Sequence, residues 1–360
     1  MPAMILAVAL AAAPLSAPPA YHIGETTRTV HPDGPRNWRG AAEPVLPTRI
    51  WYPVDAALQG HRHDIGPPDV PFFRTHPMVT DAPFAPTQTR YPLIVLSHGT
   101  GGSADTMEWL GSALAAAGYI VAGVDHPGNS AMGPETWDGF SLWWERATDV
   151  TQMLDALLAD PIIGPHIDSD RIGAAGFSLG GYTVLALAGA LTNLSAFLAF
   201  CRSPKADEIC NPPEMARVID NPADGTAPSP ERAASLARSG ASYRDPRIRA
   251  VFGISPAVGK AFDERSFANV TVPIWLMAGD ADVYVPPATN LRHIARLYPA
   301  AKVTMVPGAG HYTFIQTCEP AAVERLGLIC KDGPGIDRDA VHDLAAKAAV
   351  QFFSETLQTR

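Results

Sequence analysis

Ser178 lies in the pentapeptide Gly176-Phe177-Ser178-Leu179-Gly180, between a short apolar run at 172–175 and an apolar, helix-like stretch at 182–188. This context is typical of a sharp strand-to-helix turn that holds a serine hydroxyl out at the end of a sheet. Glycines flank the serine in such turns because the strand and the helix approach too closely there for side chains. The pattern therefore predicts a nucleophilic serine.

A serine hydroxyl needs a base and an acid, and in hydrolases with this turn the chain order is serine, acid, histidine. Asp282 follows a buried-strand candidate at 272–278, and His311 follows another at 302–306. Both residues would lie just past the carboxyl ends of strands, where open parallel sheets build their sites. We expect His311 to take the proton of Ser178, and Asp282 to orient the imidazole and stabilise its charged form.

Asp280 is the alternative acid. The segment from Gly279 to Pro286 reads Gly-x-x-Asp-x-x-x-Pro, which puts its fourth residue, Asp282, clear of the strand end. We therefore expect Asp280 to support the turn through side-chain hydrogen bonds instead.

Two backbone N–H groups must also face the negative charge that develops on the substrate. One is expected from Leu179, the residue after the nucleophile. The other is expected from Thr100, in the loop Ser97–Ser103 that follows the continuous apolar run at 92–96. The alternative reading of His98-Gly99 in this loop is a simple turn.

The chain resembles the serine α/β-hydrolases of the bacterial group known as predicted dienelactone hydrolases, which are related to platelet-activating-factor acetylhydrolases. Motifs that carry the resemblance lie at 49–53, 96–99 and 124–129, in the serine turn and in the His311 loop. Two features depart from these relatives: dienelactone hydrolases use a cysteine where this chain has Ser178, and the strand at 249–254 ends in Ser255-Pro256, without the acetylhydrolases' carboxylate. The acid must then come from the next strand, as Asp282 does, and neither relative's substrate carries over.

The order of elements predicts an α/β fold of the α/β-hydrolase type. Strand candidates at 27–30 and 47–52 would form an antiparallel edge, and later strands alternate with helices, such as one over 144–158, as in a mostly parallel sheet with helices on both faces. Residues 21–360 would form one catalytic domain. Residues 194–243 break the alternation after the nucleophile helix and are expected to form a cap over the site.

Residues 1–20 read as a secretory signal peptide, because an apolar run at 4–13 is too short to span a bilayer and small residues and prolines follow it. No other segment is long and apolar enough for a span. The chain has four cysteines, and sequence-local pairing would join Cys201 to Cys210 and Cys318 to Cys330. A zinc site is the alternative, but the spacings do not match paired ligands. We expect a secreted or periplasmic protein.

The net charge of −9 gives no reason to expect nucleic-acid or anionic-membrane binding. His61-Arg62-His63-Asp64 resembles a metal cluster but lacks further ligands, so a surface loop is expected, and no metal or organic cofactor is implied. Asp125 and His126 are expected to make structural hydrogen bonds. Trp143 and Trp144 are expected to pack against the cap, although either can contact a substrate.

These residues together predict a secreted serine hydrolase that cleaves small-molecule or lipid-like carboxylic esters through an acyl-enzyme. An amidase, a peptidase or an acyltransferase would use the same residues. Two further alternatives are a non-catalytic binding protein on a hydrolase scaffold and a metal-dependent hydrolase that uses His61 and His63. The oligomeric state and the acyl group are not specified by the sequence.

Overall fold

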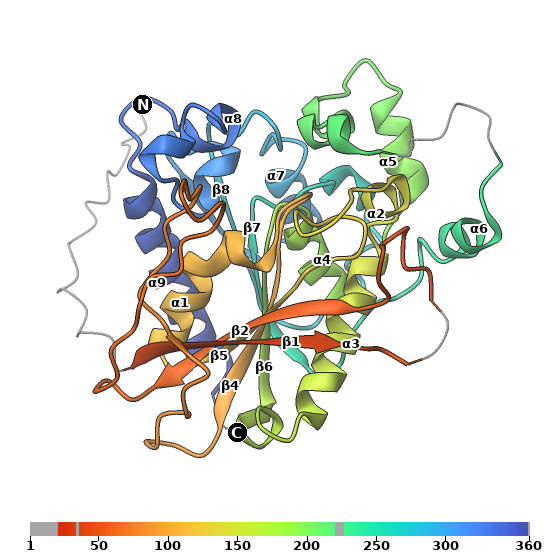
Figure 1. The fold of residues 1–360 in the computed structure, drawn as a ribbon. Helices are drawn as coiled ribbons and strands as arrows, with labels where there is room; N and C mark the ends of the chain where they lie inside the picture. Colours follow the sequence, from red (N-terminus) through yellow and green to blue (C-terminus); the bar gives the residue numbers. More distant parts are fainter. Residues whose placement is uncertain (1–20, 34–35, 220–226, 359–360) are drawn as a thin grey trace, which may run out of the picture.

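The protein is described here by a computed structural model that covers residues 21–33, 36–219 and 227–358. The expected signal peptide lies outside these residues. Within them, nine strands form one mixed sheet in the order β3-β1-β2-β5-β4-β6-β7-β8-β9 (Figure 1). The strands are β1 (His22–Val30), β2 (Leu46–Val54), β3 (Val79–Thr80), β4 (Tyr91–Ser97), β5 (Ile120–Val124), β6 (Ile167–Phe177), β7 (Ile248–Ile254), β8 (Ile274–Gly279) and β9 (Lys302–Val306).

The sheet confirms the predicted α/β-hydrolase fold. β1 pairs with β2, and β2 with β5, in antiparallel register, while β5, β4, β6, β7, β8 and β9 run parallel. The connection between β2 and β4 contains one element that the sequence did not indicate. This is β3, whose two residues pair with Gly24 and Glu25 of β1 at the edge of the sheet.

Helices cover both faces of the sheet, as predicted. Leu93 and Val95 of β4 point into a core shared with α3 and α4, whereas Ile94 and Leu96 point into a second core shared with α1 and α9. This alternation is the period-two pattern of a strand that is buried on both faces. The helices are α1 (Glu108–Ala116), α2 (Trp137–Ser141), α3 (Glu145–Ala159), α4 (Leu179–Leu187), α5 (Leu194–Cys201), α6 (Pro230–Ala237), α7 (Leu291–Leu297), α8 (Gly327–Cys330) and α9 (Arg338–Thr356).

The segment expected as a cap contains α5 and α6, which Figure 1 shows apart from the helices that flank the sheet. Asn193 caps α5 by accepting the Ala196 N–H at 2.9 Å. The expected disulfides are confirmed, with S–S distances of 2.02 Å for Cys201–Cys210 and 2.07 Å for Cys318–Cys330. In the described part of the chain, no helix has the length and apolar character needed to cross a membrane.

Candidate active site

Ser178 occupies the tight turn between β6 and α4. Its φ of 55° and ψ of −118° lie outside the regions that most residues adopt, and its N–H donates to the Ile254 carbonyl at 2.8 Å. A Cβ atom on Gly176 would lie 2.2 Å from the Gly180 oxygen, and one on Gly180 would lie 1.9 Å from the Ser97 oxygen. Only glycine fits these two positions, and their backbone contacts hold the serine in its strained conformation.

The structure brings Ser178, His311 and Asp282 together from three separate loops. Nε2 of His311 lies 2.9 Å from Oγ of Ser178, and Nδ1 of His311 lies 2.7 Å from Oδ2 of Asp282. All three residues are buried, with 7%, 4% and 3% of their surfaces exposed. An Nδ1–H that donates to the carboxylate leaves Nε2 free to accept the serine proton, which is the arrangement a serine nucleophile requires.

Asp282 and Asp280 occupy different environments, although only Ala281 lies between them. The second oxygen of Asp282 accepts the N–H groups of Tyr284 at 3.1 Å and Val285 at 2.8 Å, so backbone contacts fix the carboxylate that faces His311. Asp280 instead accepts the Gly308 N–H at 2.7 Å. Asp280 therefore joins the loops after β8 and β9, which fits the supporting role expected of it.

Thr100 and Leu179 both line the cavity that contains Ser178. Leu179 is the first residue of α4, so its N–H is one of those that a helix leaves without an internal partner. Within the described residues, no acceptor takes the N–H of Thr100. A Cβ atom on the preceding Gly99 would lie 3.2 Å from Cβ of Ser178, so the loop passes directly beside the serine.

A cavity of about 280 Å³ opens beside Ser178 and His311, and its walls are mainly apolar and aromatic. The expected cap segment supplies one side of it, and the α2–α3 region and the loop after Asp282 supply the others. Two charged residues line it, and both have partners: Glu214 accepts the Tyr312 hydroxyl at 2.7 Å, and Arg232 pairs with Asp138. The apolar and aromatic lining includes Trp137, Phe140, Trp143, Phe197, Leu198, Met215, Tyr284 and Tyr312.

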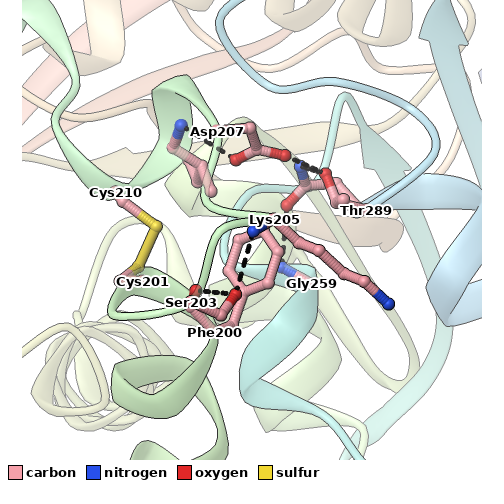
Figure 2. Close-up of a disulfide and its surroundings, with 10 residues drawn as sticks. Phe200, Cys201, Ser203, Lys205, Asp207, Cys210, Gly259 and Thr289 are labelled. Atoms are coloured by element: carbon pink, nitrogen blue, oxygen red, sulfur yellow. Dashed lines mark hydrogen bonds between the residues drawn. A yellow bond between two sulfur atoms is a disulfide. The ribbon is translucent and has the colours of Figure 1, made fainter.

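The Cys201–Cys210 disulfide forms part of this cavity wall. Figure 2 shows the loop that it closes, with the Asp207 side chain reaching Thr289 beyond the loop. The other oxygen of Asp207 accepts the Ile209 N–H at 3.3 Å. The disulfide and Asp207 thus attach one wall of the cavity to the segment that follows the Asp282 loop.

The structure places the remaining candidates away from the serine or in supporting positions. His63 contacts the buried Glu25, and Arg62 pairs with Asp64 and Glu319, so each of these side chains has a protein partner. In the described residues, no group of three or more His, Cys, Asp and Glu is arranged to hold a metal ion.

His126 makes the structural hydrogen bonds expected of it. Its Nε2 lies 2.9 Å from Ser97 Oγ, and its Nδ1 lies 2.8 Å from Asp149. Burial raises the pKa of Asp149, but the Arg39 and Arg36 charges outweigh this effect and hold it well below its ordinary value. Burial, reinforced by Arg146, lowers the pKa of His126 to about 3. The imidazole of His126 is therefore neutral beside an ionised Asp149.

The two tryptophans pack against the cap and also line the cavity. Trp143 contacts Phe197 with a ring distance of 5.2 Å, and Trp144 donates its indole N–H to Ser235 at 3.0 Å. Sequence reasoning did not single out the Tyr312–Glu214 pair, although Tyr312 directly follows His311. Burial and the Glu214 carboxylate raise the pKa of Tyr312 above its ordinary value, so this hydroxyl stays protonated and donates.

The model of the alpha/beta hydrolase family matches residues 94–326, and the chain belongs to this family. A ferulic acid esterase from Streptomyces cinnamoneus is similar in structure, with a TM-score of 0.57 and 18% sequence identity over 96% of this chain and 93% of that chain. At this identity the likeness shows a common fold. No curated protein sequence matches this chain significantly.

Proposed function

We propose that this protein hydrolyses carboxylic esters, with Ser178 as nucleophile, His311 as general base and acid, and Asp282 as the acid that orients His311. The observation that carries this proposal is the hydrogen-bonded series from Ser178 through His311 to Asp282, at 2.9 Å and 2.7 Å. Membership of the alpha/beta hydrolase family supports it.

In the proposed reaction, His311 Nε2 takes the Ser178 proton while Oγ attacks the ester carbonyl. The N–H groups of Thr100 and Leu179 stabilise the tetrahedral oxyanion. His311 then protonates the leaving alcohol, which departs as the C–O bond breaks and leaves an acyl-serine. Water, deprotonated by His311, attacks that ester and releases the acid and the free serine.

The cavity favours esters that carry an uncharged, apolar group. Its lining is aromatic and aliphatic, and its two charged side chains, Glu214 and Arg232, already have protein partners. A charged substrate group would lose its hydration there without gaining an ion pair. A small-molecule or lipid-like ester fits these walls better than a carboxylated one.

We also propose that the protein is secreted or periplasmic and that residues 194–243 act as its cap. Two disulfides support export, because such bonds persist in oxidising compartments. Within the family, the motifs at 49–53, 96–99 and 124–129 support a place in the bacterial predicted dienelactone hydrolase group. The serine at position 178 argues against transferring that group's named substrate.

The test is hydrolysis of p-nitrophenyl esters from acetyl to palmitoyl, and of methyl ferulate, by the wild type and by Ser178→Ala. We expect an optimum among uncharged esters and a loss of at least about 10⁴-fold in kcat for the variant. A folded wild type that hydrolyses none of these esters would favour a binding protein. Activity that survives Ser178→Ala would contradict the serine mechanism, and cleavage of matched anilides or transfer to added alcohols would indicate an amidase or an acyltransferase.

A further inference from the structure

A buried hydrogen-bond series lies behind the loop that carries Thr100. Nδ1 of His98 lies 2.6 Å from the Gly99 carbonyl oxygen, and Nε2 of His98 accepts the backbone N–H of His126 at 3.2 Å. Because that N–H can only donate, Nε2 is the unprotonated nitrogen and Nδ1 carries the proton. Burial, with the nearby Arg146 charge, lowers the pKa of His98 well below its ordinary value, so the ring stays neutral in this tautomer.

His98 thereby fixes the orientation of one peptide group. The Gly99 carbonyl accepts from the His98 ring and from the Gly102 N–H at 3.3 Å. Peptide bonds in the described residues are trans, so the N–H of Thr100 points away from this carbonyl. Thr100 lines the cavity beside Ser178, and a hydrogen bond to the carbonyl also polarises the N–H of the same peptide group.

Asn129 holds the other end of the loop. Its Oδ1 accepts the Gly101 N–H at 2.9 Å and Nη1 of Arg146 at 3.1 Å. Nη2 of Arg146 donates to the carbonyl of His98. Asn129 is 2% exposed and Arg146 is fully buried, and burial lowers the pKa of Arg146 to about 9.

Arg146 has no carboxylate within ion-pair distance in the described part of the chain. Its hydrogen-bond acceptors in the described residues are all neutral: the His98 carbonyl, Asn129 Oδ1 and Ser97 Oγ. A buried charge with neutral partners is costly to folding. Its contacts converge on the loop beside Ser178, which is where the proposed reaction develops negative charge.

From these contacts we propose that His98 and Asn129 are positioning residues that aim the Thr100 N–H at the substrate oxyanion, with Arg146 supporting both. This inference rests on the proposed ester hydrolysis. Neither side chain touches the reacting atoms, and each acts through the peptide groups of residues 98–101.

The test compares His98→Gln, which has no donor near the Nδ1 position, with His98→Asn, whose amide can still reach the Gly99 carbonyl. Both are assayed for kcat, KM and inhibition by a trifluoromethyl ketone, which forms a tetrahedral oxyanion on the serine. We expect His98→Gln to lower kcat by about 10- to 100-fold with KM nearly unchanged, and to weaken the inhibitor by a similar factor. His98→Asn should recover most of both losses.

Two variants of Asn129 provide an independent test if the His98 variants do not fold. Asn129→Leu removes the acceptor and should repeat the loss in kcat. Asn129→Asp loses the donor to the Gly139 carbonyl at 3.2 Å but keeps the acceptor for Gly101 and Arg146, and should retain most of the activity. Val150→Ala, in the buried face of α3 but outside these contacts, controls for loss of stability and should leave kcat unchanged.

Normal kcat and inhibitor affinity in His98→Gln and Asn129→Leu would overturn the inference. The proposed function is tested separately by labelling Ser178 with a fluorophosphonate. A wild type that is labelled and active, beside variants that are labelled and equally active, would leave the hydrolase proposal intact and reject the positioning role alone.

Discussion

Asp282 lies 2.7 Å from Nδ1 of His311, whereas Asp280, two residues earlier, accepts the backbone N–H of Gly308 at 2.7 Å. Asp280 directly follows β8, so its carboxylate meets the neighbouring loop after β9. Asp282 comes two residues later, beyond the end of the strand, where its carboxylate contacts His311. The position of each carboxylate relative to the end of the strand thus determines whether it contacts His311 or a neighbouring loop.

Replacing these two acids should therefore have unequal effects. We expect Asp282→Asn to lower kcat by about 10⁴-fold, because an amide does not hold the imidazole in the required tautomer or stabilise its charge. Asp280→Asn should stay within about tenfold of the wild type, since its contact is structural. Steady-state kinetics on one p-nitrophenyl ester measures both. Equal losses would contradict the assignment of the acid role to Asp282 alone, and a larger loss for Asp280→Asn would assign that role to Asp280.

The glycine after the serine turn should not tolerate a methyl group. A Cβ atom on Gly180 would lie 1.9 Å from the Ser97 oxygen. This oxygen is a backbone atom of the central strand β4, so moving it would disturb the sheet. We expect Gly180→Ala to lower the free energy of unfolding by more than about 2 kcal/mol. Gly133→Ala is the matched control, because no atom lies within 4 Å of the added carbon. Urea unfolding of both proteins decides the point, and two equal curves would show that the turn can relax.

The sequence predicted those parts of the fold that depend on local patterns. The apolar run before Ser178, the glycines around it and the spacing of later strands each follow from backbone sterics and burial. β3 could not be predicted, because two residues carry no period and pair only where β1 happens to lie beside them.

The contacts of Arg146 could not be predicted either. Arg146 lies next to Glu145 on α3, where charged residues at helical spacing usually mark a solvated face. Both are buried here, because their partners come from distant segments: Arg146 binds the His98 loop, and Glu145 accepts from Ser235 and Arg238 of the cap segment. No local pattern in a sequence carries such pairings.

A positive charge in the cavity wall should change which esters are accepted. Leu198 lines the cavity on α5 and is 39% exposed, so an arginine there can keep its hydration while it reaches a bound carboxylate. We expect Leu198→Arg to raise the kcat/KM ratio of p-nitrophenyl hemisuccinate to p-nitrophenyl butyrate by about fivefold, as an exposed ion pair would. Leu198→Gln is the uncharged control. An unchanged ratio would mean that the acyl group does not reach α5.

The two disulfides should differ in their effect on catalysis. Cys201 and Cys210 line the cavity, whereas Cys318 and Cys330 do not. We expect the double substitution Cys201→Ser with Cys210→Ser to raise KM for the preferred bulky ester several-fold more than KM for the acetate. The pair Cys318→Ser with Cys330→Ser should lower the melting temperature but leave that ratio unchanged. The ratio of the two KM values in each double variant, measured at a temperature where both are folded, tests this difference.

His342 should make the protein less stable as the pH falls below neutrality. Its ring stacks on Trp109 at 4.2 Å, its Nε2 donates to the Thr313 carbonyl at 2.9 Å, and burial with the Arg338 charge lowers its pKa to about 4. In the unfolded chain a histidine has a pKa of about 6.5. Between about pH 6.5 and 4, His342 is therefore protonated in the unfolded chain but neutral in the folded protein. As the pH is lowered through this range, the free energy of unfolding therefore decreases by up to about 1.4 kcal/mol per pH unit.

Asp125 contributes the opposite slope, because burial raises its pKa to about 7 and the folded state binds its proton more tightly than the unfolded chain does. The wild-type curve sums both effects, so the contribution of His342 has to be isolated by difference. His342→Gln keeps an amide donor but cannot titrate. We expect its stability relative to the wild type to improve steadily from pH 7 to pH 5 in urea unfolding. Parallel curves over that range would show that His342 does not carry the acid sensitivity.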